Sequence, residues 1–244
     1  MRVLVISDIH SNLEAFQAVL EDAGPVEKIW CLGDVVGYGP DPNACVDLLR
    51  AQPHSCVAGN HDWATLGRLD LQDFNPDARE ANLWNRSQLT PDNLAYLESL
   101  PERLVEGPFT LVHGSPQHPV WEYVLYCSTA EINADYFDTA YCLVGHTHTP
   151  AIFHLTSGDN GASCESVAPR YEQALPLGED RLFVNPGSVG QPRDGDPRAS
   201  YVLLDLDKKI IEHRRVAYPI AKTQAKMVEL DLPMRLVLRL GYGW

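Results

Sequence analysis

The first 60 residues alternate short apolar runs with amphipathic stretches, and this alternation restricts the fold more than any other feature of the chain. The runs Val3–Ile6, Ile29–Leu32 and Ser55–Ala58 are short and largely apolar, which is typical of buried strands. The stretches between them have the apolar spacing of helices. Because strands that alternate with helices pair in parallel, the sequence predicts a parallel sheet with helices packed on it.

The two predicted helices have recognisable ends. Residues 11–14, Ser-Asn-Leu-Glu, fit a capping box, and the helix that follows runs to Gly24-Pro25. Pro42–Arg50 predicts the second helix, with Asp41 as its N-cap.

The rest of the chain changes character twice. From about Asp62 to Leu100 it is helical in pattern and polar, which predicts an inserted helical layer over an edge or a site. Short strands follow, with a turn-rich loop over Gly158–Pro169 that predicts a hairpin tip, and an apolar helical tail from Pro219. The predicted strands are Phe109–His113, Tyr141–Val144, Ala151–Leu155, Arg181–Val184, Tyr201–Asp205 and Ile210–Val216. Since no linker or repeat divides the chain, we predict one domain over residues 1–244.

Charge and cysteine content disfavour several classes of function. The chain has a formal net charge of −14, which repels phosphate backbones and argues against nucleic acid as a partner. No apolar run approaches the roughly 18 residues that span a bilayer, so we expect no membrane association. Six scattered cysteines without a C-x-x-C pair, in a chain without a secretory leader, predict free buried thiols and a cytoplasmic location.

Five polar clusters each follow a predicted strand. They are Asp8-Ile9-His10, Gly33-Asp34, Gly59-Asn60-His61-Asp62, His113-Gly114 and Gly145-His146-Thr147-His148. Ligand sites of α/β sheets assemble at the carboxyl ends of strands, and residues two apart in an extended segment point to the same side. A capped turn or a buried core histidine explains any single cluster, but the five together predict one ligand set.

This donor set suits two divalent transition-metal ions. Imidazole, carboxylate and amide oxygen together suit first-row ions such as Mn²⁺, Fe²⁺, Zn²⁺ or Ni²⁺ and not an all-oxygen Ca²⁺ site. Among these ions we expect Mn²⁺. Two ions need a shared ligand, and the glycine beside Asp34 allows its carboxylate and backbone to come close.

The order D-x-H, G-D, G-N-H-D, H-G and G-H-T-H resembles the calcineurin-like metallophosphoesterase superfamily. The motifs run from Asp8 to His148, and Asn185-Pro186-Gly187-Ser188 is similar to its small bacterial and archaeal phosphodiesterase branch. The resemblance covers most of the chain. It implies an α/β fold in four layers, α/β/β/α, with two mixed sheets face to face and helices outside.

Carried over residue by residue, the resemblance implies a role for each motif residue. One ion would be held by Asp8, His10 and His148, and the other by Asn60, His113 and His146, with Asp34 bridging both. His61 would be the catalytic histidine and Asp62 the carboxylate that orients it. The phosphate-gripping arginine of the protein-phosphatase motif G-D-x-V-D-R-G is missing from Gly33–Gly39, which makes a protein phosphatase a weaker alternative.

Two residues outside the motifs are predicted to contact substrate. Asn12 lies at the start of the first helix, where helix amides favour anions, and a plain helix-start residue is the alternative. Arg193 lies in a turn-rich loop and can grip a phosphate bidentately, with a salt bridge to Asp194 or Asp196 as the alternative.

Together these features predict a dinuclear metal-dependent phosphoesterase that hydrolyses phosphodiester bonds of a small substrate. A hydroxide bridging the two ions would attack phosphorus directly, and His61 would protonate the leaving oxygen. The alternatives are a phosphomonoesterase, a dinucleoside polyphosphate hydrolase and a non-catalytic binding scaffold of the same fold. The complete ligand set favours catalysis over a binding scaffold. The sequence is compatible with either a monomer or a homo-oligomer.

Overall fold

The computed structural model describes residues 1–158 and 161–244, and in these residues it contains two mixed sheets of six strands each. The first consists, in order, of β3 (His54–Cys56), β2 (Lys28–Cys31), β1 (Arg2–Ile6), β11 (Ala199–Asp205), β12 (Ile210–Val216) and β9 (Ala174–Pro176). The second consists of β4 (Arg103–Glu106), β5 (Phe109–Val112), β6 (Tyr141–Leu143), β10 (Arg181–Asn185), β7 (Ala151–Gly158) and β8 (Gly161–Val167). As predicted, β1, β2 and β3 pair in parallel, whereas β11 joins β1 in the antiparallel sense.

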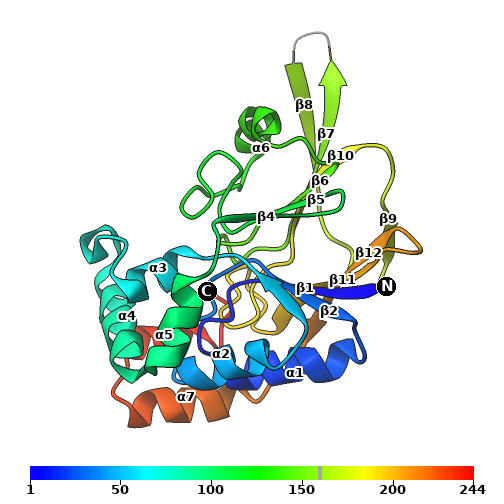
Figure 1. The fold of residues 1–244 in the computed structure, drawn as a ribbon. Helices are drawn as coiled ribbons and strands as arrows, with labels where there is room; N and C mark the ends of the chain where they lie inside the picture. Colours follow the sequence, from blue (N-terminus) through cyan, green and yellow to red (C-terminus); the bar gives the residue numbers. More distant parts are fainter. Residues whose placement is uncertain (159–160) are drawn as a thin grey trace.

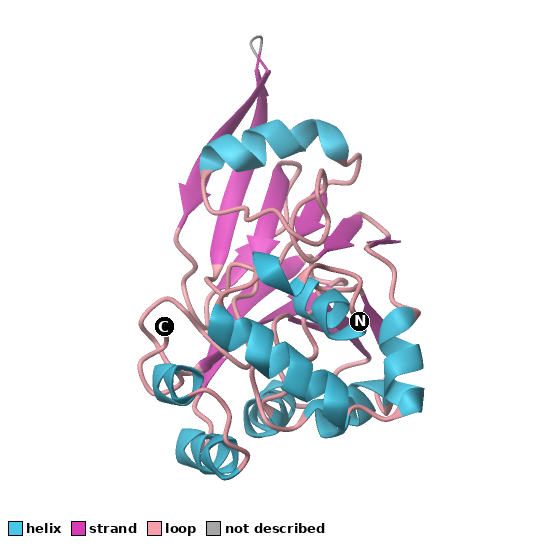
Figure 2. Cartoon of the chain, turned by 90° about the vertical axis from the view of Figure 1, so that its left-hand side faces the viewer, coloured by secondary structure: helices cyan, strands magenta, loops and turns pink. Residues whose placement is uncertain are grey.

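Helices cover the outer face of each sheet, which gives the predicted four layers (Figure 1). Helices α1 (Leu13–Ala23) and α2 (Pro42–Arg50) pack on the first sheet, and α6 (Cys127–Asn133) packs on the second. Figure 2 shows the strands between these helical layers. The chain also forms α3 (Asn60–Leu66), η1 (Leu71–Asp73), α4 (Pro76–Gln88), α5 (Pro91–Glu98), η2 (Ala134–Tyr136), α7 (Ile220–Glu229) and α8 (Met234–Arg239). In the described residues, no helix has the length and apolar character needed to cross a membrane.

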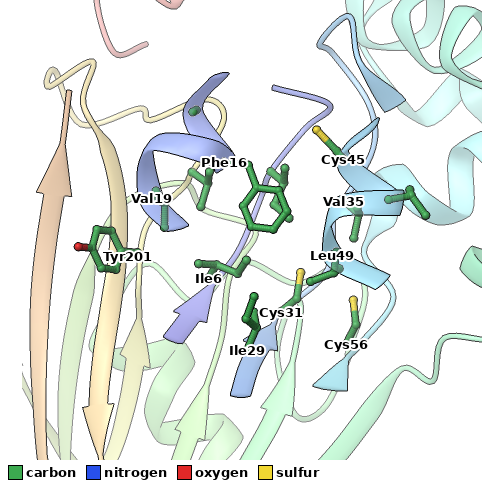
Figure 3. Packing of buried hydrophobic residues seen from close by; sticks show 14 of the residues in the cluster. Ile6, Phe16, Val19, Ile29, Cys31, Val35, Cys45, Leu49, Cys56 and Tyr201 are labelled. Carbon is green, nitrogen blue, oxygen red and sulfur yellow. The ribbon is translucent and has the colours of Figure 1, made fainter. Parts of the chain in front are cut away.

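The alternation of side chains along β1 explains the layers. Leu4 and Ile6 pack with Phe16 of α1, and Figure 3 shows Ile6 and Phe16 within this layer. Val3 and Val5 point the other way and pack against the second sheet. All five side chains are fully buried. Since burying one such side chain contributes about 1.5–3 kcal/mol, both faces of β1 hold the layers together.

The first helix begins one residue later than the predicted capping box requires. Asn12 is the N-cap, and its side-chain oxygen accepts a hydrogen bond from a backbone amide of the helix at 3.2 Å. Ser11 has a left-handed backbone and donates to Asn85 Oδ1 at 2.6 Å. The buried Glu14 pairs with Lys226 of α7 at 2.7 Å instead of returning to the N-cap. Glu14, which the sequence placed in a capping box, therefore makes a tertiary contact with α7 instead.

The inserted segment forms the helical layer that its sequence predicts. Helix α4 ends before Leu89, and α5 begins at Pro91 with Thr90 as its N-cap. On α4, Asn82 and Asn85 are fully buried, so the layer turns polar side chains toward the body of the protein. Asn82 of α4 contacts His61, so this helical layer covers a candidate site, as predicted.

The hairpin predicted around Gly158–Pro169 is confirmed, since β7 and β8 pair in the antiparallel sense, but the extent of the predicted loop is wrong. Strand β7 ends at Gly158 and β8 spans Gly161–Val167, so most of this segment is strand, while residues 159–160 lie outside the described part. Small and polar residues give β8 little of the hydrophobic alternation by which a strand is recognised. Strands β4 and β9 and helix α6 were not predicted either, and each is short.

The expectation of free thiols is wrong for two of the six cysteines. Cys127 at the start of α6 and Cys164 of β8 form a disulfide, with their Cα atoms 5.3 Å apart. They are 37 residues apart in sequence, and only the packing of α6 beside β8 brings them together. The other four are buried free thiols, as predicted: Cys31, Cys45, Cys56 and Cys142.

Candidate metal centre and adjoining cavities

The seven predicted metal ligands lie together at the carboxyl ends of the central strands. They follow β1, β2, β3, β5 and β6, and each is at most 4% exposed: Asp8, His10, Asp34, Asn60, His113, His146 and His148. The carboxylates and imidazoles form two groups, within each of which the donor atoms lie within 4.8 Å of one another. Parallel pairing brings these strand ends, which are far apart in sequence, to one edge.

The first group contains Asp8, His10 and His148. His10 Nε2 and His148 Nε2 are 3.1 Å apart. Asp8 Oδ1 lies 3.6 Å from His10 Nε2 and 3.2 Å from His148 Nε2. Three donor atoms therefore lie together, in the grouping that the family resemblance implies.

The second group surrounds a neighbouring point. His113 Nε2 lies 3.0 Å from Asn60 Oδ1 and 3.1 Å from His146 Nδ1. Asp34 Oδ2 lies between the two groups, 3.3 Å from His113 Nε2 and 3.6 Å from His10 Nε2. The Asp34 carboxylate therefore faces donor atoms of both groups.

Each of the four histidines is held through its other ring nitrogen by a backbone carbonyl. The contacts are His10 Nδ1 to Val36 O at 3.2 Å, His113 Nδ1 to Leu32 O at 2.7 Å, His148 Nδ1 to Gln191 O at 2.6 Å and His146 Nε2 to Trp121 O at 3.1 Å. A carbonyl only accepts hydrogen bonds, so the bonded nitrogen carries a proton, and the opposite nitrogen faces the group. Contacts of this kind orient the rings of metal-binding histidines.

The donor atoms fit cations. Asp8 Oδ1 and Asp34 Oδ2 are buried without a hydrogen bond. Burial lowers the pKa of His148 to about 3, so its ring is neutral and its Nε2 lone pair points toward His10. Buried charges and facing lone pairs are costly unless a partner of opposite charge lies among them. Mixed imidazole, carboxylate and amide donors suit divalent transition metals.

The backbone is strained at five of the predicted ligands. Their φ values are positive: 56° at Asp8, 49° at His10, 54° at Asp34, 64° at His146 and 58° at His148. Residues other than glycine rarely adopt this conformation, which costs on the order of 1–3 kcal/mol each. Such strain persists only where the surrounding structure imposes it. Its concentration here supports a functional role for these loops.

His61 lies beside the centre and is held by an asparagine. Its Nδ1 is 2.9 Å from Asn82 Oδ1, and its backbone amide donates to Asp34 Oδ1 at 2.8 Å. Burial lowers the pKa of His61 to about 3, while Asp34 and the hydrogen bond to Asn82 act in the opposite direction. The sequence reasoning missed Asn82, because an asparagine within a polar helical stretch carries no motif.

The structure corrects the orienting role predicted for Asp62. Its carboxylate accepts hydrogen bonds from three backbone amides, those of Asp34 at 2.9 Å, Gly59 at 2.9 Å and Val36 at 3.2 Å. These amides belong to the loops after β2 and β3. Asp62 therefore fixes the loop that carries Asp34, and Asn82 makes the contact with the imidazole of His61.

The hydrogen bonds of Asn12 favour the helix-start alternative over a substrate contact. The side chain is buried and caps α1 through Oδ1. Its Nδ2 donates to Gly190 O at 2.9 Å and to the Tyr218 hydroxyl at 3.2 Å. Both ends of the amide thus have partners within the protein.

The surroundings of Arg193 favour its predicted role over the salt-bridge alternative. Asp194 pairs with Arg215, and Asp196 pairs with Arg198 at 2.6 Å and with Arg215 at 3.7 Å. In residues 1–158 and 161–244, the ion pairs do not include Arg193. Its guanidinium group is therefore available to an anion.

Two adjoining cavities lie next to the donor groups. The centre cavity, about 240 Å³, is lined by residues that include Asn60, His61, Phe74, Trp121, Tyr123 and His146. The arginine cavity, about 650 Å³, is lined by residues that include Asp77, Arg193, Arg235, Arg239, Tyr242 and Trp244. Tyr38, Asn75 and Arg193 line both cavities. The two spaces therefore meet at Arg193.

Comparison with known proteins gives concordant results. A model of the calcineurin-like phosphoesterase superfamily domain matches residues 1–209. The crystal structure of a metallophosphoesterase from Sphaerobacter thermophilus is 49% identical, has a TM-score of 0.89, and matches 100% of this chain and 99% of that one.

Two curated proteins are also similar in sequence. An uncharacterized protein of Methanocaldococcus jannaschii is 41% identical over 254 residues, which cover 99% of this chain and 98% of that protein. A symmetrical bis(5'-nucleosyl)-tetraphosphatase of Pseudomonas putida is 30% identical over 105 residues, which are 36% of each chain. The similarity to the tetraphosphatase is therefore partial on both sides.

Proposed function

The chain belongs to the calcineurin-like phosphoesterase superfamily, as its motifs predicted, and from this premise we propose that it is a dinuclear metal-dependent phosphodiesterase acting on a small substrate. The observation that carries the proposal is the pair of buried donor groups joined by Asp34. Family membership supports phosphoester hydrolysis in general. The preference for diesters follows the resemblance to the phosphodiesterase branch and the missing protein-phosphatase arginine.

We assign the ions as the sequence predicted, with Mn²⁺ favoured over Fe²⁺, Zn²⁺ or Ni²⁺. Asp8, His10 and His148 would hold one, and Asn60, His113 and His146 the other, with Asp34 shared. When bound, two divalent ions supply charge that stabilises phosphoryl oxygens and activate water as the nucleophile. The carbonyl contacts keep the four imidazoles oriented toward the centre. No side chain needs to form a covalent phosphoenzyme.

We assign proton delivery to His61 and its position to Asn82. The hydrogen bond from Nδ1 to Asn82 Oδ1 leaves Nε2 as the ring atom that can give a proton to the leaving oxygen. Because burial lowers the pKa of His61, the ring is neutral at pH 7 in the free protein. An anionic substrate in the centre cavity would favour the protonated ring, and proton delivery by His61 depends on that effect.

A dinucleoside polyphosphate hydrolase is the second candidate. It is favoured by the similarity to the Pseudomonas putida tetraphosphatase, which spans 36% of each chain. In such a substrate the reacting phosphorus also carries two substituents, so the same centre serves both candidates. The two differ in what must be bound beyond the reacting phosphate.

A substrate panel with Mn²⁺ tests the proposal. It compares an aryl phosphodiester, an aryl phosphomonoester, cyclic nucleotides and a dinucleoside polyphosphate. We expect the diester or the polyphosphate to be hydrolysed faster than the monoester. A faster monoester reaction would overturn the diester preference. No turnover of any substrate by folded protein that holds two ions would instead favour a non-catalytic scaffold.

A cytoplasmic location remains a prediction. It draws on the four buried free thiols, and the Cys127–Cys164 disulfide is the observation that counts against it, because disulfides are rare in reducing compartments.

A further inference from the structure

The arginine cavity concentrates positive charge in an acidic protein. Arg193, Arg235 and Arg239 line it, and Asp77 is the one acidic residue among the lining residues. The whole chain has a formal net charge of −14, so three guanidinium groups around one space run against its average composition. A cavity of this kind attracts anions, and planar guanidinium groups match the geometry of phosphate oxygens.

Arg193 connects this cavity to the reacting end of the site. Its Nη2 atom donates to Gln191 Oε1 at 2.9 Å and to the Tyr38 hydroxyl at 3.3 Å. Its Nε is buried without a hydrogen bond. Both hydrogen-bond partners are neutral, so no carboxylate balances the positive charge of this guanidinium group. Its charge and its unused Nε donor can therefore both interact with an anionic ligand. Since Arg193 lines both cavities, that ligand can extend from one to the other.

Arg239 and Arg193 line the same cavity, and the Nε of Arg239 donates a hydrogen bond to the backbone oxygen of Trp244. Burial, followed by the charge of Arg193, lowers the pKa of Arg239 to about 10, while Tyr38 and Asp77 act in the opposite direction. Arg235 lies one helical turn earlier on α8 and is exposed. An anion between these groups would be attracted by their positive charges.

An aromatic pair lines the same cavity. Tyr242 and Trp244 are stacked, with ring centroids 5.0 Å apart, and are 58% and 65% exposed. Exposed aromatic rings beside arginines are typical of surfaces on which a nucleobase stacks. The cavity therefore offers both a site for anionic phosphate and a site for a planar base.

We propose that the arginine cavity binds the second phosphate and the nucleoside of a nucleoside polyphosphate whose reacting phosphate lies in the centre cavity. This inference rests on the proposed function and names its substrate class. Arg193 would contact both phosphates, Arg235 and Arg239 the distal one, and Tyr242 and Trp244 the base. A simple aryl diester has neither a second phosphate nor a nucleobase, so it would not contact these residues.

Kinetics with two substrates test the inference in the Mn²⁺-loaded enzyme. Arg235→Gln and Arg239→Gln are each expected to lower kcat/KM for diadenosine tetraphosphate about tenfold relative to bis(p-nitrophenyl) phosphate, the loss of one charge-assisted contact. Arg103→Gln, which removes an exposed arginine of β4, is the matched control and should leave the ratio unchanged. A ratio unaltered in both cavity variants would overturn the proposal.

Binding to the metal-free protein separates the inference from the proposed function. By calorimetry, both cavity variants should bind inorganic tripolyphosphate about tenfold more weakly than wild type. Tyr242→Ala should weaken adenosine 5'-tetraphosphate binding and spare tripolyphosphate. Equal affinity of the wild type and the arginine variants for tripolyphosphate would exclude the phosphate site. An equal loss of affinity for both ligands in Tyr242→Ala would exclude the nucleoside site. If catalysis fails with every substrate, these measurements still decide the inference.

Discussion

The donor groups and the arginine cavity are built in opposite ways. The predicted ligands occupy short loops after β1, β2, β3, β5 and β6 and are almost fully buried, five of them with a strained backbone. The arginine cavity draws instead on the loop that holds Arg193, on Asn75 and Asp77 at the start of α4, and on the segment from α8 onward. Its side chains are partly or fully exposed at Arg193, Arg235 and Arg239.

We infer from this difference that the donor groups serve the chemical step and the arginine cavity serves substrate selectivity. The buried loops cannot move without disturbing both sheets, so changes there should affect every substrate alike. The cavity is made of helical additions and a surface loop, so changes there should depend on the substrate. The predictions below test that separation, beginning with the largest effect.

Asp34→Asn is expected to lower kcat/KM at least roughly 10⁴-fold for diester and polyphosphate alike, because the shared ligand is lost. Steady-state kinetics with both substrates provide the measurement. Asp138→Asn, which changes an exposed carboxylate, is the control. A loss confined to one substrate would mean that Asp34 serves selectivity, and the separation of roles would fail.

His61→Gln should keep the bound ions and the melting temperature and lose about 10²–10⁴-fold in kcat, the range of general acid catalysis. The loss should be smallest for a nitrophenolate leaving group, which is stable as an anion. It should be largest for an alkoxide, which needs the proton. The same loss for both leaving groups would assign His61 to charge stabilisation instead of proton transfer.

The metal-free centre should also respond to pH. Burial opposes a charge on His113, but Asp34 raises its pKa to about 9, above the ordinary value of about 6.5. The ion pair therefore stabilises the folded state fully below about pH 6.5, by up to about 3 kcal/mol, and this contribution disappears as the pH rises through 9. Thermal unfolding of metal-free protein from pH 6 to 9.5 should show it, and His113→Gln should lack that fall.

Bound Mn²⁺ should reverse this trend. Ligation requires His113 without its Nε2 proton, so the stabilisation by Mn²⁺ should increase toward pH 9. A stabilisation by Mn²⁺ that stays constant over this range would exclude His113 from the ligand set.

Asn82→Ala should produce the smallest loss, about tenfold in kcat, because it only positions His61. The loss should follow the leaving group in the same direction as in His61→Gln, and Asn82→Asp should restore it by keeping the acceptor. Asp62→Asn is the contrast, since its carboxylate holds the loop of Asp34. We expect that variant to lose stability and bound metal without dependence on the leaving group.

Local patterns predicted the parallel β1–β3 unit and the clustering of the donor residues, whereas the four layers were implied by the family resemblance. Buried strands are recognised in the sequence by their apolar runs. Short loops that follow parallel strands lie together at the carboxyl edge of the sheet. Sequence reasoning failed where a residue's role depends on distant packing. Glu14 reads as a capping acid but pairs with Lys226 of α7, and Asp62 follows His61 in sequence yet binds the backbone of another loop.

Residues of the arginine cavity were still harder to find. Arg235 and Arg239 lie on an amphipathic tail with no motif, and nothing in the sequence links them to Arg193. Only the packing of α8 near the loop of Arg193 brings their charges to one space. Selectivity residues of this kind are therefore visible from structure alone.

The central claim is that the two donor groups hold two ions together. Elemental analysis of the Mn²⁺-reconstituted, desalted protein tests it most directly, with folding checked on the same sample. We predict close to two Mn²⁺ per chain in the wild type, far fewer in Asp34→Asn, and about one in His148→Ala. One ion or none in folded wild-type protein, or equal losses in the two variants, would contradict the account.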